Sequence, residues 1–61
     1  MICKFTECKS NQVIGINSEF IVAVFEATEG DFKGKTVLNL INGAVAIEED
    51  LVTVFGQLAA V

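Results

Sequence analysis

The sequence predicts a small α+β domain, in which an antiparallel sheet of about five strands is followed by one C-terminal helix. Three observations predict this class: short apolar stretches separated by turn residues, a hairpin signal at Asn42-Gly43, and a helical repeat that follows Glu48-Glu49-Asp50. The chain has 61 residues, so we expect residues 1–61 to form a single domain.

The strand predictions rest on alternation and on the turn residues between apolar segments. In the first segment Cys3 and Phe5 share one face, and in the second Ile14 and Ile16 do. Turn residues at 9–11 separate these two segments. The expected strands are residues 2–7, 12–16, 20–27, 35–41 and 44–47.

The segment 20–27 is unusual because it is apolar on both faces. Strict alternation places one set of side chains on one face, namely Phe20, Val22 and Val24. It places another set on the opposite face, namely Ile21, Ala23 and Phe25. A strand that is buried on both sides has this pattern. In so small a sheet the chain's own core can cover only one face, so the pattern predicts that the other face meets the helix, a curled sheet or a partner.

The loop at 28–34 contains two glycines and one aromatic residue, Phe32, among polar neighbours. Two interpretations stay open for this ring. It folds back onto the sheet, or it is an exposed anchor for a partner, since aromatic residues are enriched in interfaces.

The last third of the chain predicts a hairpin and then a helix. Asn42-Gly43 is a two-residue hairpin signal, because both residues tolerate positive φ. Three carboxylates at 48–50 suit the first turn of a helix. Apolar residues then recur on one expected helix face, which consists of Leu51, Val54, Phe55 and Leu58.

The amount of apolar sequence predicts self-association. Hydrophobic residues make up 52% of the chain, although a chain of about 60 residues buries only about 60% of its unfolded surface. The longest stretch without a charge, residues 36–47, is too short for the ~20 residues of a membrane span. We therefore expect the excess to lie in a subunit interface.

The two cysteines and the N-terminus predict a cytoplasmic protein. The first residues show no apolar signal-peptide segment. A disulfide between Cys3 and Cys8 would close a very short loop, so we expect two reduced thiols, with Cys3 in the core and Cys8 in a turn.

The ionisable residues argue against catalysis and against nucleic-acid binding. The chain has no histidine and a net charge of −4, so the commonest general base is missing and phosphate is repelled. We expect no enzyme activity, no cofactor, no metal and no nucleic-acid partner. One acidic row, Glu26, Glu29 and Asp31, leaves open an alternative in which the protein inhibits a nucleic-acid-binding protein by imitating phosphate.

Several short motifs resemble the small swarming-motility proteins associated with flagella, the SwrD- or FlbD-like proteins of bacteria. The matching stretches are residues 4–6, 16–21, 24–26, 40–43 and 47–49, and they span most of the chain. The basic residue that this family places before the helix has no counterpart. The resemblance implies a small non-catalytic protein of bacterial or phage origin.

A second resemblance is to the carbon storage regulators, which are dimeric RNA-binding proteins of five strands and a C-terminal helix. The stretches that carry it are Val13-Ile14-Gly15 and residues 45–50. This resemblance implies an intertwined dimer, and RNA-binding regulation is the function it offers as an alternative. Thr6-Glu7 stands where that family has threonine-arginine, so the shared feature would be the fold without its RNA-binding arginines.

The sequence therefore predicts a non-catalytic interaction or regulatory module that binds a second copy of itself and, in addition, another protein. The candidate interface residues are Phe20, Val22, Val24, Phe25, Phe32 and Phe55.

Overall fold

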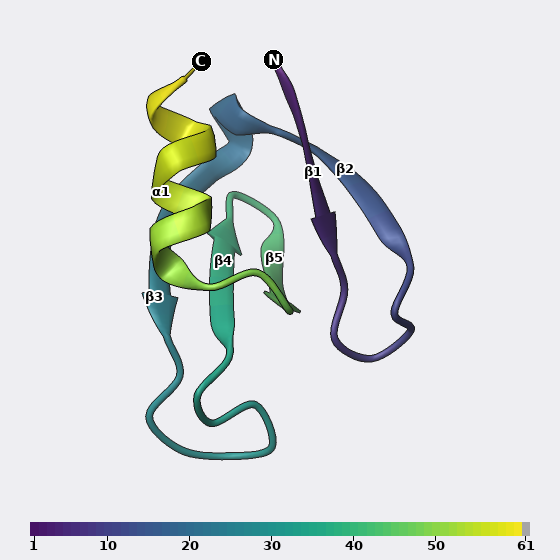
Figure 1. The fold of residues 1–61 in the computed structure, drawn as a ribbon, viewed down its shortest axis with the longest axis vertical. Coiled ribbons are helices and arrows are strands. Elements are labelled where there is room, and N and C mark those ends of the chain that lie inside the picture. Colours follow the sequence, from purple (N-terminus) through teal and green to yellow (C-terminus); the bar gives the residue numbers. More distant parts are fainter. Residues whose placement is uncertain (61) are drawn as a thin grey trace.

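A computed structural model describes residues 1–60 and confirms the predicted α+β class (Figure 1). Five antiparallel strands are followed by one C-terminal helix. The elements are β1 (Ile2–Thr6), β2 (Val13–Asn17), the short 3-10 helix η1 (Ser18–Phe20), β3 (Ile21–Glu26), β4 (Thr36–Leu40), β5 (Gly43–Ile47) and α1 (Leu51–Ala59). The strands form two sheets and not one: a β1–β2 hairpin and a β3-β4-β5 meander.

The two sheets are joined by a short pairing between the end of β1 and the end of β5. Glu7 and Ile47 form an isolated antiparallel bridge. The backbone N–H of Cys8 donates to the carbonyl of Ala46 at 2.9 Å, and the N–H of Glu48 donates to the carbonyl of Thr6 at 2.8 Å. The chain beyond β1 therefore continues along β5, which fixes the hairpin against one end of the meander.

The core lies between the meander, the hairpin and the helix. Its fully buried side chains come from four different elements, namely Phe5, Leu38, Ile47 and Val54. Cys3 and Ile16 complete it from the hairpin. The expected core position of Cys3 is confirmed, and Phe5, which was predicted on the same face, is buried with it.

The faces predicted for the strand at 20–27 are partly wrong, because β3 contains a bulge. The pairing with β4 shifts between Ile21 and Ala23, so that one extra residue lies on the β3 side. As a result Ile21 and Val24, three positions apart, both pack against the core, whereas Val22 is 63% exposed. Phe20 lies before the strand, in η1.

The helix begins later than expected, and its buried face is different. Asp50 is the N-cap, and its side chain accepts a hydrogen bond from the N–H of Thr53 at 2.8 Å. No acidic residue lies in the first turn. Val54 is fully buried, and Leu51 and Leu58, about one helical turn before and after it, are half-buried. Phe55, in contrast, is 52% exposed. A buried stripe centred on Val54 leaves Phe55 on its flank.

The hairpin between β4 and β5 is confirmed, with its turn displaced by one residue. Leu40 pairs with Gly43, so Ile41 and Asn42 are the two turn residues. Gly43 has φ +154° and is already the first residue of β5.

Candidate interaction surface

The meander has an outer face, on the side opposite the core, that carries no charged residue. Residues directly opposite in an antiparallel pair share a face, so the pairing register defines two rows across the sheet. The rows of this outer face are Phe25–Val37–Ala46 and Ala23–Asn39–Ala44. Five of the six side chains are apolar. An antiparallel sheet with one solvated face normally carries polar residues there, so the composition of this face differs from that of an ordinary solvated face.

Exposed apolar side chains gather at the β3 end of this sheet. Phe20 is 49% exposed, Val22 is 63% exposed and Phe25 is 47% exposed. These three lie within six consecutive residues. Single exposed apolar residues are ordinary on a protein surface, whereas a contiguous group of them marks an interaction site.

The free edge of β3 adds unpaired backbone groups to this surface. β3 pairs only with β4 among the strands of residues 1–60. The N–H of Ala27 donates to the carbonyl of Lys35 at 2.9 Å, so Ala27 is a residue that bonds toward β4. In antiparallel pairing, residues whose backbone groups bond to the partner strand alternate with residues whose groups do not. By this alternation, the N–H and C=O groups of Val24 and Glu26 point away from β4. The edge can therefore accept another strand.

The helix contributes two more exposed apolar side chains near this strand. Of the meander strands, β3 is the one against which α1 makes its main contacts, and Figure 1 shows the helix lying over the β3 end of the sheet. Val52 is 81% exposed and Phe55 is 52% exposed. Exposed aliphatic and aromatic groups thus occur on both elements at this end of the molecule.

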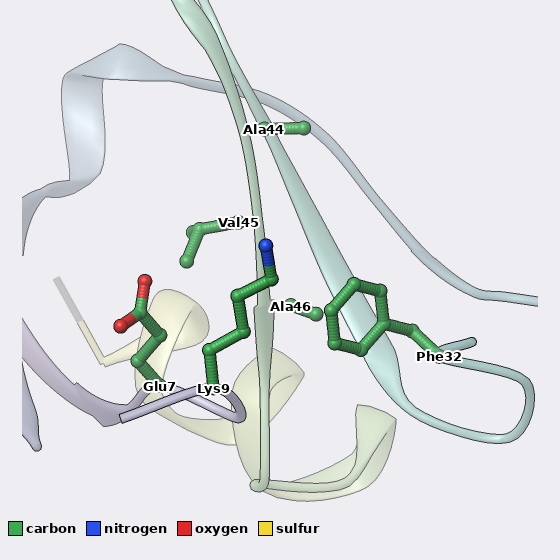
Figure 2. A pocket seen from close by; sticks show the side chains of 6 residues that line it. All are labelled: Glu7, Lys9, Phe32, Ala44, Val45 and Ala46. Atoms are coloured by element: carbon green, nitrogen blue, oxygen red, sulfur yellow. The ribbon is translucent and has the colours of Figure 1, made fainter. Parts of the chain in front are cut away.

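Phe32 lies against β5, at the opposite end of the outer face from β3. Together with Ala44 and Ala46 it lines one side of a shallow pocket of about 200 Å³. Figure 2 shows these three side chains on one side of β5, with Val45 and Glu7 on the other. The half-buried state of the ring agrees with the interpretation in which the loop folds back onto the sheet.

Lys9 and Glu7 are the charged residues of this pocket. The Glu7 carboxylate accepts a hydrogen bond from the Ser10 hydroxyl at 2.6 Å. The arrangement offers one cation and one anion beside an apolar wall.

The carboxylates expected to begin the helix instead connect three parts of the chain. Both Glu49 oxygens accept from the backbone N–H of Thr6, at 2.8 and 3.0 Å, and one also accepts from the Thr6 hydroxyl at 3.0 Å. Glu48 pairs with the Lys35 ammonium at 2.7 Å. The sequence showed these residues as an acidic cluster, but the contact of Glu49 with Thr6 depends on the β1–β5 contact, which no local pattern reveals.

The surroundings of Cys8 disfavour its thiolate form. Desolvation, and then a hydrogen bond to the Glu48 carboxylate, raise the pKa of the Cys8 thiol above its usual value. The hydrogen bond from Lys35 is the main reason why the pKa of Glu48 lies below its usual value. Since the thiolate is the nucleophile, a raised pKa disfavours cysteine chemistry. Cys3 and Cys8 are both free thiols.

The structure separates the six candidate interface residues into two groups. Phe20, Val22, Phe25 and Phe55 are exposed. Val24 packs against the core and Phe32 is half-buried in its loop. The interpretation of the sequence did not include Val37, Ala44, Ala46 and Val52 as surface candidates. The first three could have been found from the alternation of β4 and β5, because they occupy the positions opposite to the predicted core residues.

Comparisons with known proteins give no relative: no family model, no curated protein and no solved structure matches the chain. The two family resemblances remain predictions. Across residues 1–60 the structure contains no helix that is long and apolar enough to cross a membrane. The same residues contain no group of three or more side chains that could hold a metal ion.

Proposed function

We propose that this protein is a non-catalytic interaction or regulatory module that acts as a homo-oligomer. The observation that carries this proposal is the uncharged outer face of the β3-β4-β5 meander, bordered by the exposed Phe20, Val22 and Phe25. The hairpin and the helix cover the inner face of the same sheet. A second polypeptide that meets the sheet along β3 would shield the exposed side chains at this border.

The charge distribution permits a second copy as that partner. The chain carries a net charge of −4, so two copies repel one another at long range. None of that charge lies on the six positions of the outer face. Two copies can therefore meet at this sheet without placing like charges directly opposite each other. Like charges in that position would weaken the association.

Light scattering across a range of protein concentrations tests this proposal. We expect a mass above that of the 6.5 kDa chain that falls on dilution. Val22→Glu should lower the mass, because a carboxylate replaces an exposed apolar side chain at β3. The matched control is Val13→Glu, at a position that is 69% exposed in β2, and it should leave the mass unchanged. A wild-type chain that is monomeric at every concentration, or equal effects of both variants, would refute the proposal.

A further inference from the structure

We propose that two copies of this chain pair through the free edges of their β3 strands, antiparallel and with the two-fold axis at Phe25, to form one continuous six-stranded sheet. This inference rests on the proposed function and deepens it, since it specifies how the two copies meet.

The backbone supplies the first argument. Val24 and Glu26 are the residues of regular β3 whose N–H and C=O point away from β4, as the bond from Ala27 to Lys35 establishes. They stand on either side of Phe25. A two-fold axis at Phe25 places Val24 of one copy opposite Glu26 of the other, so that all four edge groups of each copy find a partner. Strand addition of this kind obtains its affinity from main-chain hydrogen bonds.

The side chain at the axis supplies the second argument. Phe25 lies on the outer face and is 47% exposed. In the proposed register it faces Phe25 of the second copy as a non-hydrogen-bonded pair, with Cα atoms about 4.5 Å apart. Aromatic pairs across two strands are stabilising beyond the area that they bury. A half-exposed aromatic ring thus lies at the centre of the contact.

The bulge explains why the axis does not lie nearer to the start of the strand. The regular pairing of β3 with β4 begins at Ala23, after the shift that follows Ile21. A register centred on Val24 would have to recruit the irregular residue Val22 as a hydrogen-bonding partner of Glu26. The register centred on Phe25 uses only the regular part of the strand.

The available area agrees with a dimer of modest size. Phe20, Phe25 and Phe55 each expose about half of their surface, which amounts to about 300 Å² per chain if one phenylalanine offers about 200 Å². A standard interface buries about 800 Å² per partner. Val22, Val52 and the paired backbone supply further area, which places the contact toward the lower end of the standard range and makes it dependent on concentration.

The first experiment removes an edge donor without disturbing the β3–β4 pairing. Glu26→Pro deletes an N–H that points away from β4, at an exposed position on an edge strand, where proline is tolerated. We expect the dimer dissociation constant to rise at least about tenfold, since one hydrogen bond per copy is lost, while circular dichroism shows a folded chain. The control Glu26→Gln keeps the N–H and removes the two like charges near the axis. It should dimerise at least as tightly as the wild type.

The second experiment fixes the register and remains informative if the proline variant fails to fold. In a Cys8→Ser background, Phe25→Cys should form a disulfide-linked dimer under mild oxidation, since the expected Cα separation lies within the range that a disulfide spans. Ala23→Cys is the control. In this register its two copies are separated by four positions along the strand, about 13 Å, so they should not be linked.

The outcomes distinguish this inference from the proposed function. A dimer that survives Glu26→Pro and links at position 23 as readily as at position 25 overturns the edge pairing but leaves self-association standing. Linkage of Val24→Cys in place of Phe25→Cys overturns the register. If the chain is monomeric in every experiment, both the self-association and the edge pairing are refuted. The β3 edge would then be a binding site for an extended segment of a different protein.

Discussion

The hairpin and the meander both turn one face toward the core, but their opposite faces differ. On the hairpin, Lys4 pairs with Gly15 and Ile2 pairs with Asn17 on the outward side, so charged and polar groups alternate with apolar ones. On the meander the outer face has no charge at all. Exposed apolar side chains occur on both sheets, such as Ile2 and Val13 on the hairpin and Val22 and Phe25 on the meander. The difference lies in their neighbours, because the six outward positions of the meander strands carry no charge beside them.

The largest effect should come from the inner face of the meander. Leu38→Ala removes a fully buried side chain at the centre of β4. Such changes cost about 2–5 kcal/mol, whereas the core of a domain this small supplies only about 3–5 kcal/mol. We expect the variant to be largely unfolded in water. Urea titration followed by circular dichroism measures this effect.

The exposed side of β3 provides the comparison for that variant. Val22→Ala, at a position that is 63% exposed, should change the unfolding free energy of the monomer by less than about 0.5 kcal/mol. A loss comparable to that of Leu38→Ala would show that the β3 surface belongs to the monomer's own core, and would weaken the distinction between the two faces.

A smaller effect is expected at the contact between the hairpin and the segment before the helix. Glu49→Ala leaves the Thr6 N–H and hydroxyl without the carboxylate that accepts from both. Hydrogen bonds to charged groups contribute about 1.5–3 kcal/mol each at most sites, and we expect a total loss of about 1–3 kcal/mol because water can reach this half-buried contact. Glu29→Ala, in the exposed loop, is the control for the loss of one negative charge. Equal unfolding midpoints for the two variants would contradict a specific role for Glu49.

The strands could be predicted because their information is local. Alternation located all five strands and placed Cys3 and Phe5 on one face of the first, and both side chains are buried. The bulge in β3 could not be predicted, since nothing in an unbroken apolar run marks which residue is unpaired. The exposure of Phe55 was missed for a related reason. The helical period alone does not show which of two neighbouring apolar stripes faces the core. The packing around Val54 determines it, and this packing involves residues far away in the sequence.

The candidate surface was predictable only at its centre. Apolarity on both faces of residues 20–27 predicted that the chain's own core would cover only one face, but strict alternation wrongly assigned Val24 to the same face as Val22. The arrangement of the strands in two sheets was not predicted either. The contact that joins these sheets, the bridge between Glu7 and Ile47, connects residues forty positions apart. Long-range pairing of this kind has no signature within a single segment.

The smallest effect, and the one that depends on pH, should come from the helix N-cap. The hydrogen bond from the Thr53 N–H holds the pKa of the Asp50 carboxyl below its ordinary value. A carboxyl whose folded pKa is depressed stabilises the fold above its unfolded pKa of about 3.9, and this contribution is lost as the pH falls through the lower, folded pKa. Asp50→Asn keeps a capping oxygen but cannot titrate. We therefore expect wild type and variant to differ near pH 7 and to converge toward pH 3 in urea titrations. Glu48 also has a lowered pKa and is present in both proteins, so it contributes the same residual slope to each. Parallel pH profiles for the two proteins would show that the Asp50 charge does not contribute to capping α1.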